Sequence, residues 1–283
     1  MKKIRYFSSF CDSQTCKNKV ELICNYVAND EYIITCDDDY THAILLNQPM
    51  PRLTVPKENV IGFAFEPPYF LNLTPEFVSY AQANIGVYWI NEKGGLPSPF
   101  REGYAFMWHI VPPLITNHHR GLCSIMVSQK RCTQGHRYRH ELVEAILSTQ
   151  FPVDIYGRGC SSYAEYKDAR VKGAFSDDET DITMYSQYVF HIAVENGRCS
   201  YYMSEKLINP LLCRTTPLYW GCPQAAAVFP DCFHGLSGNL SQDMKFLYDV
   251  LKNPTKYIQP IDPRKIEERV NILKNLPFLF SDT

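Results

Sequence analysis

The chain has 283 residues, of which 45% are hydrophobic and 20% are charged, so it is long enough for two compact domains and too apolar for extensive disorder. Its 28 basic and 30 acidic residues give a formal charge of -2, and no block of lysine and arginine would hold a nucleic-acid backbone, which argues against nucleic acid as a partner. No apolar run reaches the roughly 18 residues of a membrane span, and the first residues lack the long apolar stretch of a signal peptide. We therefore expect a cytoplasmic protein without an integral membrane segment.

In chain order, short apolar runs alternate with helical patterns, which is typical of α/β units with largely parallel sheets. The apolar runs predict strands at residues 3–8, 31–35, 41–46, 59–65, 85–90, 123–128, 152–156, 188–194 and 215–220. Apolar residues at helical spacing predict helices at residues 17–28, 75–83, 137–149, 204–214, 241–252 and 262–275. A stretch with two prolines at 111–121 separates the two alternating series, so we expect domains at 1–115 and 116–283, with helix 262–275 packing on the domains.

Polar residues that suggest a ligand site follow the strand predicted at 188–194. The strand runs into Glu195 and Asn196, at the carboxyl edge where open parallel sheets bind ligands. Ser204 has the side chain of a helix N-cap, which places Lys206 in the first turn, where the helix dipole disfavours a cation by about 0.3–1 kcal/mol. A bound anion would compensate for this cost. The alternative is that Lys206 points into water and Glu205 balances the dipole.

Residues 188–223, YVFHIAVENGRCSYYMSEKLINPLLCRTTPLYWGCP, resemble the donor-site motif of the α-1,3/4-fucosyltransferases, glycosyltransferase family 10, in order and spacing. The resemblance implies an inverting transferase that moves L-fucose from GDP-fucose to a hydroxyl of a glycan or glycoconjugate acceptor, in α-1,3 linkage. It also implies the GT-B fold, in which two Rossmann-like domains with parallel sheets face a cleft. Residues 1–115 would then form the acceptor side and 116–283 the GDP-fucose side, with no cofactor required and no divalent metal essential.

Carried over by position, four residues of this motif would line the nucleotide-sugar site. They are Asn196, Tyr202, Glu205 and Lys206. Lys206 would meet the diphosphate and Glu205 the ribose hydroxyls, because an ammonium donor and a carboxylate acceptor suit these groups. The weaker candidates are the neighbouring Glu195 and three residues at a glycine-containing turn, Tyr156, Gly157 and Arg158.

A second cation is expected because the departing GDP gathers charge on its diphosphate. The segment RYRHELVEAIL at 137–147 is similar to a family pattern R-x-x-F-x-x-x-L, and Arg139 fits it, with Leu142 and Ile146 at the apolar positions. We therefore expect Arg139 at the diphosphate and keep Arg137 as a weaker candidate. The alternative is that both arginines are solvated residues of a helix start.

An inverting transfer also needs a base that accepts the proton of the acceptor hydroxyl. In VIGFAFEPPYF at 60–70 an apolar strand ends at Glu66, and Pro67 and Pro68 restrict the backbone beyond it. Taken alone, a glutamate at a strand end is usually a solvated loop residue. The acceptor-side motif of the family looks like this segment, so the resemblance implies that Glu66 is the catalytic base.

Two other functions stay open. Asp37, Asp38 and Asp39 follow an apolar strand and resemble the D-x-D metal site of the GT-A architecture, so a metal-dependent GT-A glycosyltransferase is one alternative. A non-catalytic module that binds a nucleotide sugar or a carbohydrate is the other. The 11 cysteines are scattered and never spaced C-x-x-C, so we interpret them as mostly reduced thiols.

Overall fold

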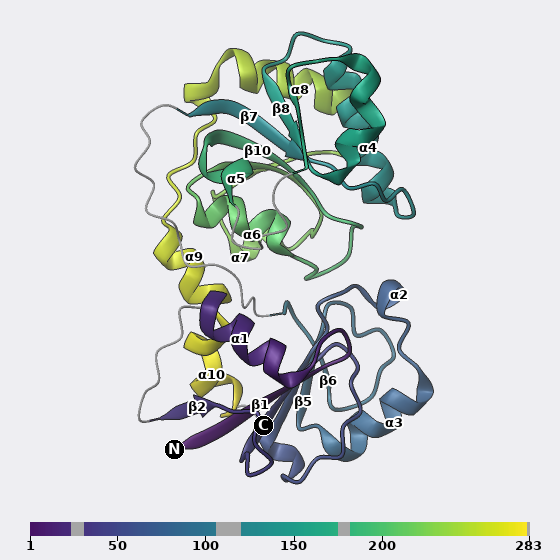
Figure 1. The fold of residues 1–283 in the computed structure, drawn as a ribbon, viewed down its shortest axis with the longest axis vertical. Helices are drawn as coiled ribbons and strands as arrows, with labels where there is room; N and C mark the ends of the chain where they lie inside the picture. Colours follow the sequence, from purple (N-terminus) through teal and green to yellow (C-terminus); the bar gives the residue numbers. More distant parts are fainter. Residues whose placement is uncertain (24–30, 106–119, 175–181, 282–283) are drawn as a thin grey trace. The chain divides into compact units, whose positions relative to one another are not determined.

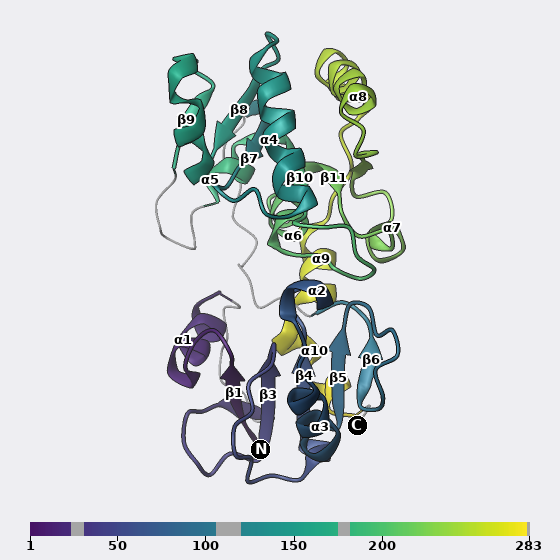
Figure 2. The same cartoon turned by 90° about the vertical axis from the view of Figure 1, so that its right-hand side faces the viewer.

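The computed structural model describes residues 1–23, 31–105, 120–174 and 182–281, which form two compact units. The N-terminal unit is built from Met1–Val111, Cys199–Tyr202 and Glu267–Thr283, and the C-terminal unit from Pro112–Arg198 and Met203–Ile266. Each unit has a parallel six-stranded sheet with helices packed against it (Figure 1, Figure 2). The domain boundary predicted at 115/116 lies outside the described residues.

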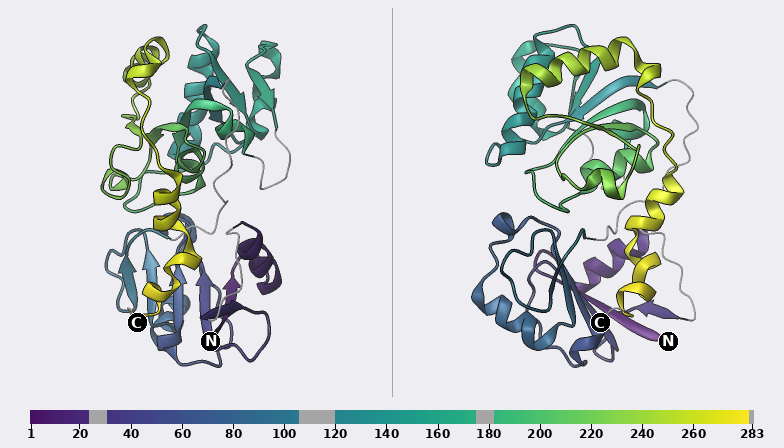
Figure 3. Two further views of the ribbon diagram at one scale, coloured as in Figure 1. Left: turned by 90° about the vertical axis from the view of Figure 1, so that its left-hand side faces the viewer. Right: turned by 180° about the vertical axis from the view of Figure 1, so that it is seen from behind.

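The N-terminal sheet has the strand order β2-β1-β3-β4-β5-β6, which reverses direction between β1 and β3. Its strands are β1 (Lys2–Ser8), β2 (Tyr32–Ile34), β3 (His42–Leu46), β4 (Val60–Phe63), β5 (Val87–Ile90) and β6 (Phe100–Glu102). Ile44 belongs to the core under α1 (Ser13–Ile23) and α10 (Ile272–Leu279), whereas Leu45 belongs to the core under α3 (Pro75–Asn84). Figure 3 shows the sheet between these helices. Because both faces are buried, β3 is a continuous apolar run rather than an alternating one.

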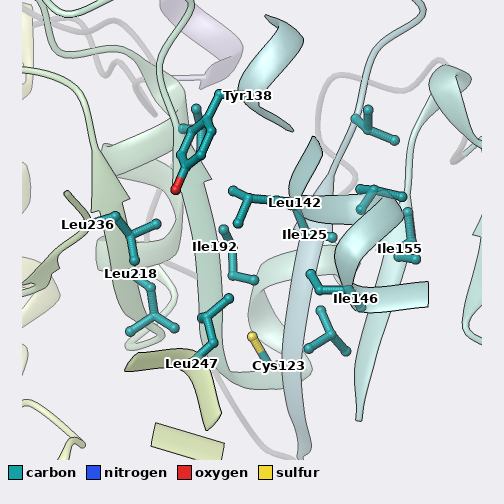
Figure 4. Packing of buried hydrophobic residues seen from close by; sticks show 14 of the residues in the cluster. Cys123, Ile125, Tyr138, Leu142, Ile146, Ile155, Ile192, Leu218, Leu236 and Leu247 are labelled. Atoms are coloured by element: carbon teal, nitrogen blue, oxygen red, sulfur yellow. The ribbon is translucent and has the colours of Figure 1, made fainter. Parts of the chain in front are cut away.

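The C-terminal sheet has the order β12-β11-β10-β7-β8-β9, which is the strand order of the Rossmann fold and reverses between β7 and β10. Its strands are β7 (Gly121–Met126), β8 (Val153–Tyr156), β9 (Val171–Gly173), β10 (Tyr188–Val194), β11 (Thr216–Trp220) and β12 (His234–Gly235). On one face, α4 (Gln134–Leu147) and α8 (Leu240–Lys252) cover the core drawn in Figure 4. On the other, His191 contacts the ring of Tyr185 in α5 (Thr183–Ser186).

Shorter elements complete the two units. They are η1 (Lys57–Asn59), α2 (Pro68–Leu71), η2 (Arg158–Tyr166), α6 (Glu205–Leu212), α7 (Ala225–Val228), η3 (Pro254–Lys256) and α9 (Pro263–Val270). No helix among the described residues is both long enough and apolar enough to cross a membrane.

The predicted α/β fold with two Rossmann-like parallel sheets is confirmed, and all nine predicted strands are present. The short edge strands β6, β9 and β12 were not predicted, because their sequences, FRE, VKG and HG, contain at most one large apolar residue each and so show no apolar run. The single helix predicted at 262–275 is wrong. The helical segment is interrupted at Asn271. The side-chain oxygen of Asn271 accepts hydrogen bonds from the backbone N–H groups of Leu273 and Lys274 and so caps a separate helix, α10.

Candidate functional site

The carboxyl ends of β7 and β10 form the point where the strand order of the C-terminal sheet reverses. Open parallel sheets bind ligands at such a point, because the connections leave the two strands toward opposite faces. Helix α4 follows β7, and Glu195 and Asn196 follow β10. The predicted donor residues of α4 and of the β10 end therefore belong to one region.

The start of α4 lies directly against the end of β10. The backbone N–H of Gly135 donates to the carbonyl of Asn196 at 3.0 Å. A Cβ atom at position 135 would lie only 1.7 Å from the carbonyl oxygen of Glu195, so a side chain there has no space. Thr133 caps the helix by accepting from the backbone N–H of His136. Glycine at 135 thus lets the first turn of α4 approach Asn196.

Arg139 lies one turn further along α4 and is 4% exposed. Its Nη2 donates to Oδ1 of Asn196 at 2.6 Å, and its Nε donates to the carbonyl of Gly135 at 3.3 Å. Arg137 is exposed and donates from Nη1 to the carbonyl of Cys132 at 3.4 Å. The structure therefore brings Arg139, and not Arg137, into contact with Asn196.

Lys206 lies in the first turn of α6, as predicted, and Oγ of Ser204 accepts from its backbone N–H as the N-cap. Its side chain is 12% exposed, so Lys206 does not point into water, but the other part of that alternative holds, because Glu205 pairs with it. Nζ contacts Glu205 Oε1 at 2.6 Å and Ser204 Oγ at 3.1 Å, and lies 4.0 Å from Glu195 Oε2. These contacts neutralise the charge that the helix dipole disfavours.

The ionisation of Lys206 follows from these neighbours. Burial by itself lowers the pKa of the Lys206 ammonium, but the carboxylates of Glu205 and Glu195 outweigh burial and raise that pKa above its ordinary value. The positive charge of Arg139 opposes them. Lys206 is therefore charged at neutral pH and lies within electrostatic range of a second cation.

Glu195 has a role that the sequence did not reveal. Its carboxylate is fully buried and accepts from the N–H of Ser204 at 2.8 Å, from the hydroxyl of Ser204 at 2.6 Å and from the hydroxyl of Tyr219 at 3.4 Å. Burial raises the pKa of this carboxyl, and the Lys206 ammonium acts in the opposite direction. Glu195 thus fixes the residue that caps α6. The sequence feature that could have indicated this role is the position of the carboxylate directly after a buried strand.

The weaker candidates of the glycine-containing turn lie at the carboxyl end of β8. The hydroxyl of Tyr156 pairs with that of Tyr188 at 2.6 Å. Gly157 has a φ of 107°, and a Cβ there would lie 2.3 Å from the carbonyl oxygen of Val127, so the position requires glycine. Arg158 is exposed at the start of η2 and lines a cavity of about 450 Å³ between η2 and β9.

Glu66 and Tyr202 lie together within the N-terminal unit. Glu66 is half-buried, three residues after β4, and the hydroxyl of Tyr202 donates to its Oε2 at 3.5 Å. Tyr202 is 2% exposed and ends the segment Cys199–Tyr202, which belongs to this unit. Two further hydrogen bonds hold the segment, from Asn91 Nδ2 to the carbonyl of Tyr201 at 3.4 Å and from the N–H of Ser200 to Glu92 Oε1 at 3.0 Å. The donor motif is therefore divided between the two units.

Two residues of the acidic run at 37–39 form ion pairs with basic side chains. Asp38 Oδ1 lies 2.5 Å from Arg5 Nη1, and Asp39 forms an ion pair with Lys3. In the part of the chain that the structure describes, no group of three His, Cys, Asp or Glu side chains could hold a metal ion. The GT-A alternative does not fit the fold, because that architecture does not consist of two parallel Rossmann-like sheets.

Residues 117–259 match the model of a family described as glycosyltransferase family 10 (fucosyltransferase), C-terminal part. The match covers α4, β10 and α6, and with them the contacts of Arg139, Asn196 and Lys206. The chain belongs to glycosyltransferase family 10. Membership confirms the family that the donor motif resembles.

Two curated relatives are GDP-fucose protein O-fucosyltransferase 3 of Danio rerio and of Bos taurus. The first is 28% identical over 178 residues, which are 59% of this chain and 38% of the relative. The second is 31% identical over 126 residues, which are 43% of this chain and 25% of the relative. This family 10 chain thus spans well under half the length of these relatives.

Solved structures agree with the fold. An α1,3-fucosyltransferase crystallised with GDP-fucose has a TM-score of 0.55 and 14% identity, with 100% of this chain and 91% of that chain covered. Anabaena HepE in complex with UDP-glucose has a TM-score of 0.61 and 9% identity, with 100% and 99% covered. At such identities the likeness shows the fold alone, and this fold is of GT-B type.

Proposed function

We propose that this family 10 chain is an inverting fucosyltransferase that transfers L-fucose from GDP-fucose to an acceptor hydroxyl. One observation carries the proposal. Arg139 and Lys206 come from two different helices at the strand-order reversal of the C-terminal sheet. Both cations are largely buried, and half-buried polar side chains, Asn196 and Glu205, hold them. Two cations at such a point suit the diphosphate of a nucleotide sugar. GDP-fucose is supported as the nucleotide sugar because the Danio rerio relative is named a GDP-fucose protein O-fucosyltransferase and the solved α1,3-fucosyltransferase was crystallised with GDP-fucose.

In this proposal the donor is bound without an essential metal ion. Arg139 and Lys206 contact the diphosphate and stabilise the negative charge that gathers there as GDP leaves. Asn196 orients Arg139, and Glu205 accepts from the ribose hydroxyls. Lys206 and Glu205 are themselves in contact, so in this proposal the two donor contacts are made by adjacent side chains of opposite charge.

The proposed base is Glu66. Its carboxylate accepts the proton of the acceptor hydroxyl as the oxygen attacks the anomeric carbon from the face opposite GDP, and the bond to the diphosphate breaks. The configuration at the anomeric carbon is thereby inverted. The support for this role is the place of Glu66 beyond a carboxyl strand end and its hydrogen bond from Tyr202.

The proposed acceptor is a hydroxyl of a glycan or glycoconjugate, in α-1,3 linkage. A second candidate is a hydroxyl of a protein side chain, because the matched relatives in Danio rerio and Bos taurus are named as protein O-fucosyltransferases. The expected cytoplasmic location stays a prediction, which fractionation of the source cells would test.

The decisive experiment incubates the purified chain with GDP-fucose on a glycan array and, in parallel, with folded protein acceptors. We expect GDP release and a fucose added to members of one acceptor set, at the same rate with and without EDTA. Binding of GDP in calorimetry without transfer to any acceptor would favour the non-catalytic module. If GDP does not bind at all, the proposed donor site is wrong. A transfer rate that is lost in EDTA and restored by Mn²⁺ would contradict metal independence.

A further inference from the structure

Two cysteines flank the start of α1 in the N-terminal unit. Asp12 caps this helix, since its Oδ1 accepts from the N–H of Thr15 at 2.7 Å and its carbonyl accepts from the N–H of Cys16 at 3.0 Å. Cys11 therefore precedes the cap, and Cys16 is the fourth residue of the helix. Side chains at these two positions pack on each other in many helices, usually as an apolar pair that fixes the entry of the chain. Here the pair consists of two thiols.

The two sulfur atoms are already in contact. Sγ of Cys11 lies 3.3 Å from Sγ of Cys16. A disulfide has a sulfur–sulfur distance of about 2.05 Å, so the bond needs an approach of roughly 1.3 Å. Cys11 is half-buried, whereas Cys16 is fully buried. A reagent in solution therefore reaches Cys11 first, and the Cys16 thiol is then in contact with the modified sulfur atom.

Cys11, the outer thiol of the pair, also borders a cavity of about 520 Å³. Cys11, Asp12, Ser13 and Gln14 contribute the start of α1 to its wall, and Ser8 contributes the end of β1. This is the carboxyl end of β1, next to the point where the N-terminal strand order reverses. The position of the α1 start thus shapes a cavity at a place where open sheets bind ligands.

We propose that Cys11 and Cys16 form a reversible disulfide that locks the start of α1 and with it one wall of this cavity. The oxidant is a small-molecule disulfide such as oxidised glutathione. The Cys11 thiolate attacks one of its sulfurs, which releases the first small thiol and leaves a mixed disulfide on Cys11. The Cys16 thiolate then attacks the Cys11 sulfur and releases the second small thiol. The protein loses two electrons and two protons, and one small disulfide becomes two thiols.

The second step is the slow one. Burial, with the neighbouring Cys11, raises the pKa of the Cys16 thiol, so its thiolate is scarce at neutral pH and becomes more abundant in alkali. The mixed disulfide on Cys11 should therefore accumulate early and decay faster as the pH rises. Neither step depends on the proposed fucosyl transfer.

The test titrates the full chain with reduced and oxidised glutathione and reads intact mass, followed by peptide mapping of blocked thiols. We expect a species lighter than the reduced protein by about 2 Da, with its bond between the peptides of Cys11 and Cys16. It should melt a few degrees higher than the reduced chain and revert with dithiothreitol. Cys36→Ser is the matched control, because Cys36 is half-buried on the same cavity and should leave the bond unchanged.

Cys16→Ser should trap the glutathione adduct on Cys11, and Cys11→Ser should abolish the lighter species. Thermal unfolding of both reduced variants checks that they fold. A reduced Cys11–Cys16 pair under conditions that oxidise exposed Cys132 would overturn the proposal. So would a bond mapped from Cys11 to Cys36.

Discussion

Arg139 and Asn196 are 57 positions apart in the sequence and are joined by a hydrogen bond of 2.6 Å from Nη2 to Oδ1. The bond connects the helix after the first strand of the C-terminal sheet with the end of the fourth, across the reversal of strand order. It holds a buried guanidinium in one orientation, which is what recognition of a diphosphate requires.

Arg139→Ala should weaken GDP binding about 10- to 100-fold, because the change removes charge-assisted hydrogen bonds. Isothermal titration calorimetry measures the affinity. Arg137→Ala is the matched control on the same helix, and its exposed side chain should leave the affinity within about twofold. Equal losses in the two variants would remove Arg139 from the proposed site.

Glu66→Gln should lower the rate of fucosyl transfer by about 10²-fold or more, because the amide cannot accept the proton of the acceptor hydroxyl. GDP affinity should not change, since the proposed donor contacts lie on other residues. The two quantities are measured by product formation at saturating donor and by calorimetry. If Glu66→Gln transfers fucose at nearly the normal rate, the catalytic base is a residue other than Glu66.

Tyr202→Phe separates two roles of one residue. If Tyr202 positions Glu66 through their hydrogen bond, transfer should fall about 3- to 10-fold with GDP affinity unchanged. The donor-binding role predicted from the sequence instead requires weaker GDP binding. Measuring both parameters on the same preparation tells which role holds.

Gly135→Ala should destabilise the chain by at least about 2 kcal/mol, because the new methyl group would overlap the carbonyl of Glu195 and force the helix away from β10. Gly235→Ala in the same unit is the control, since a Cβ there meets no atom within 4 Å. Urea unfolding compares the two. A stable Gly135→Ala variant would show that α4 does not approach β10 so closely.

The stability of the chain should fall with acid from about pH 6.5 downward. Burial lowers the pKa of His191 to about 3, and burial together with Arg139 lowers that of His136 to about 4. The unfolded chain takes up these protons near pH 6.5 whereas the folded chain does not, so acid favours unfolding between roughly pH 6.5 and 4. Melting temperatures from pH 8 to 4 should decline less in His191→Asn than in the unchanged chain, and identical declines would contradict the assignment.

Local sequence was sufficient for those parts of the site that depend on neighbours a few positions away. The hydroxyl of Ser204 and the apolar residues after it predict the start of α6, and the structure has it there. Arg139 lies three and seven positions before Leu142 and Ile146, so all three share the inward face of one helix, whereas Arg137 does not. The apolar run of β10 likewise predicts a strand buried on both faces.

Tertiary structure alone decided which distant residues meet. The sequence does not indicate that Cys199–Tyr202 packs in the N-terminal unit beside Glu66, that Glu195 holds the cap of α6, or that the side chain of Lys206 is largely buried. Helix and strand periodicity and capping arise from residues within about one turn of each other. Hydrogen-bond partners and burial depend instead on the order of the strands in the sheet, which brings residues such as Arg139 and Asn196 together from far apart in the chain.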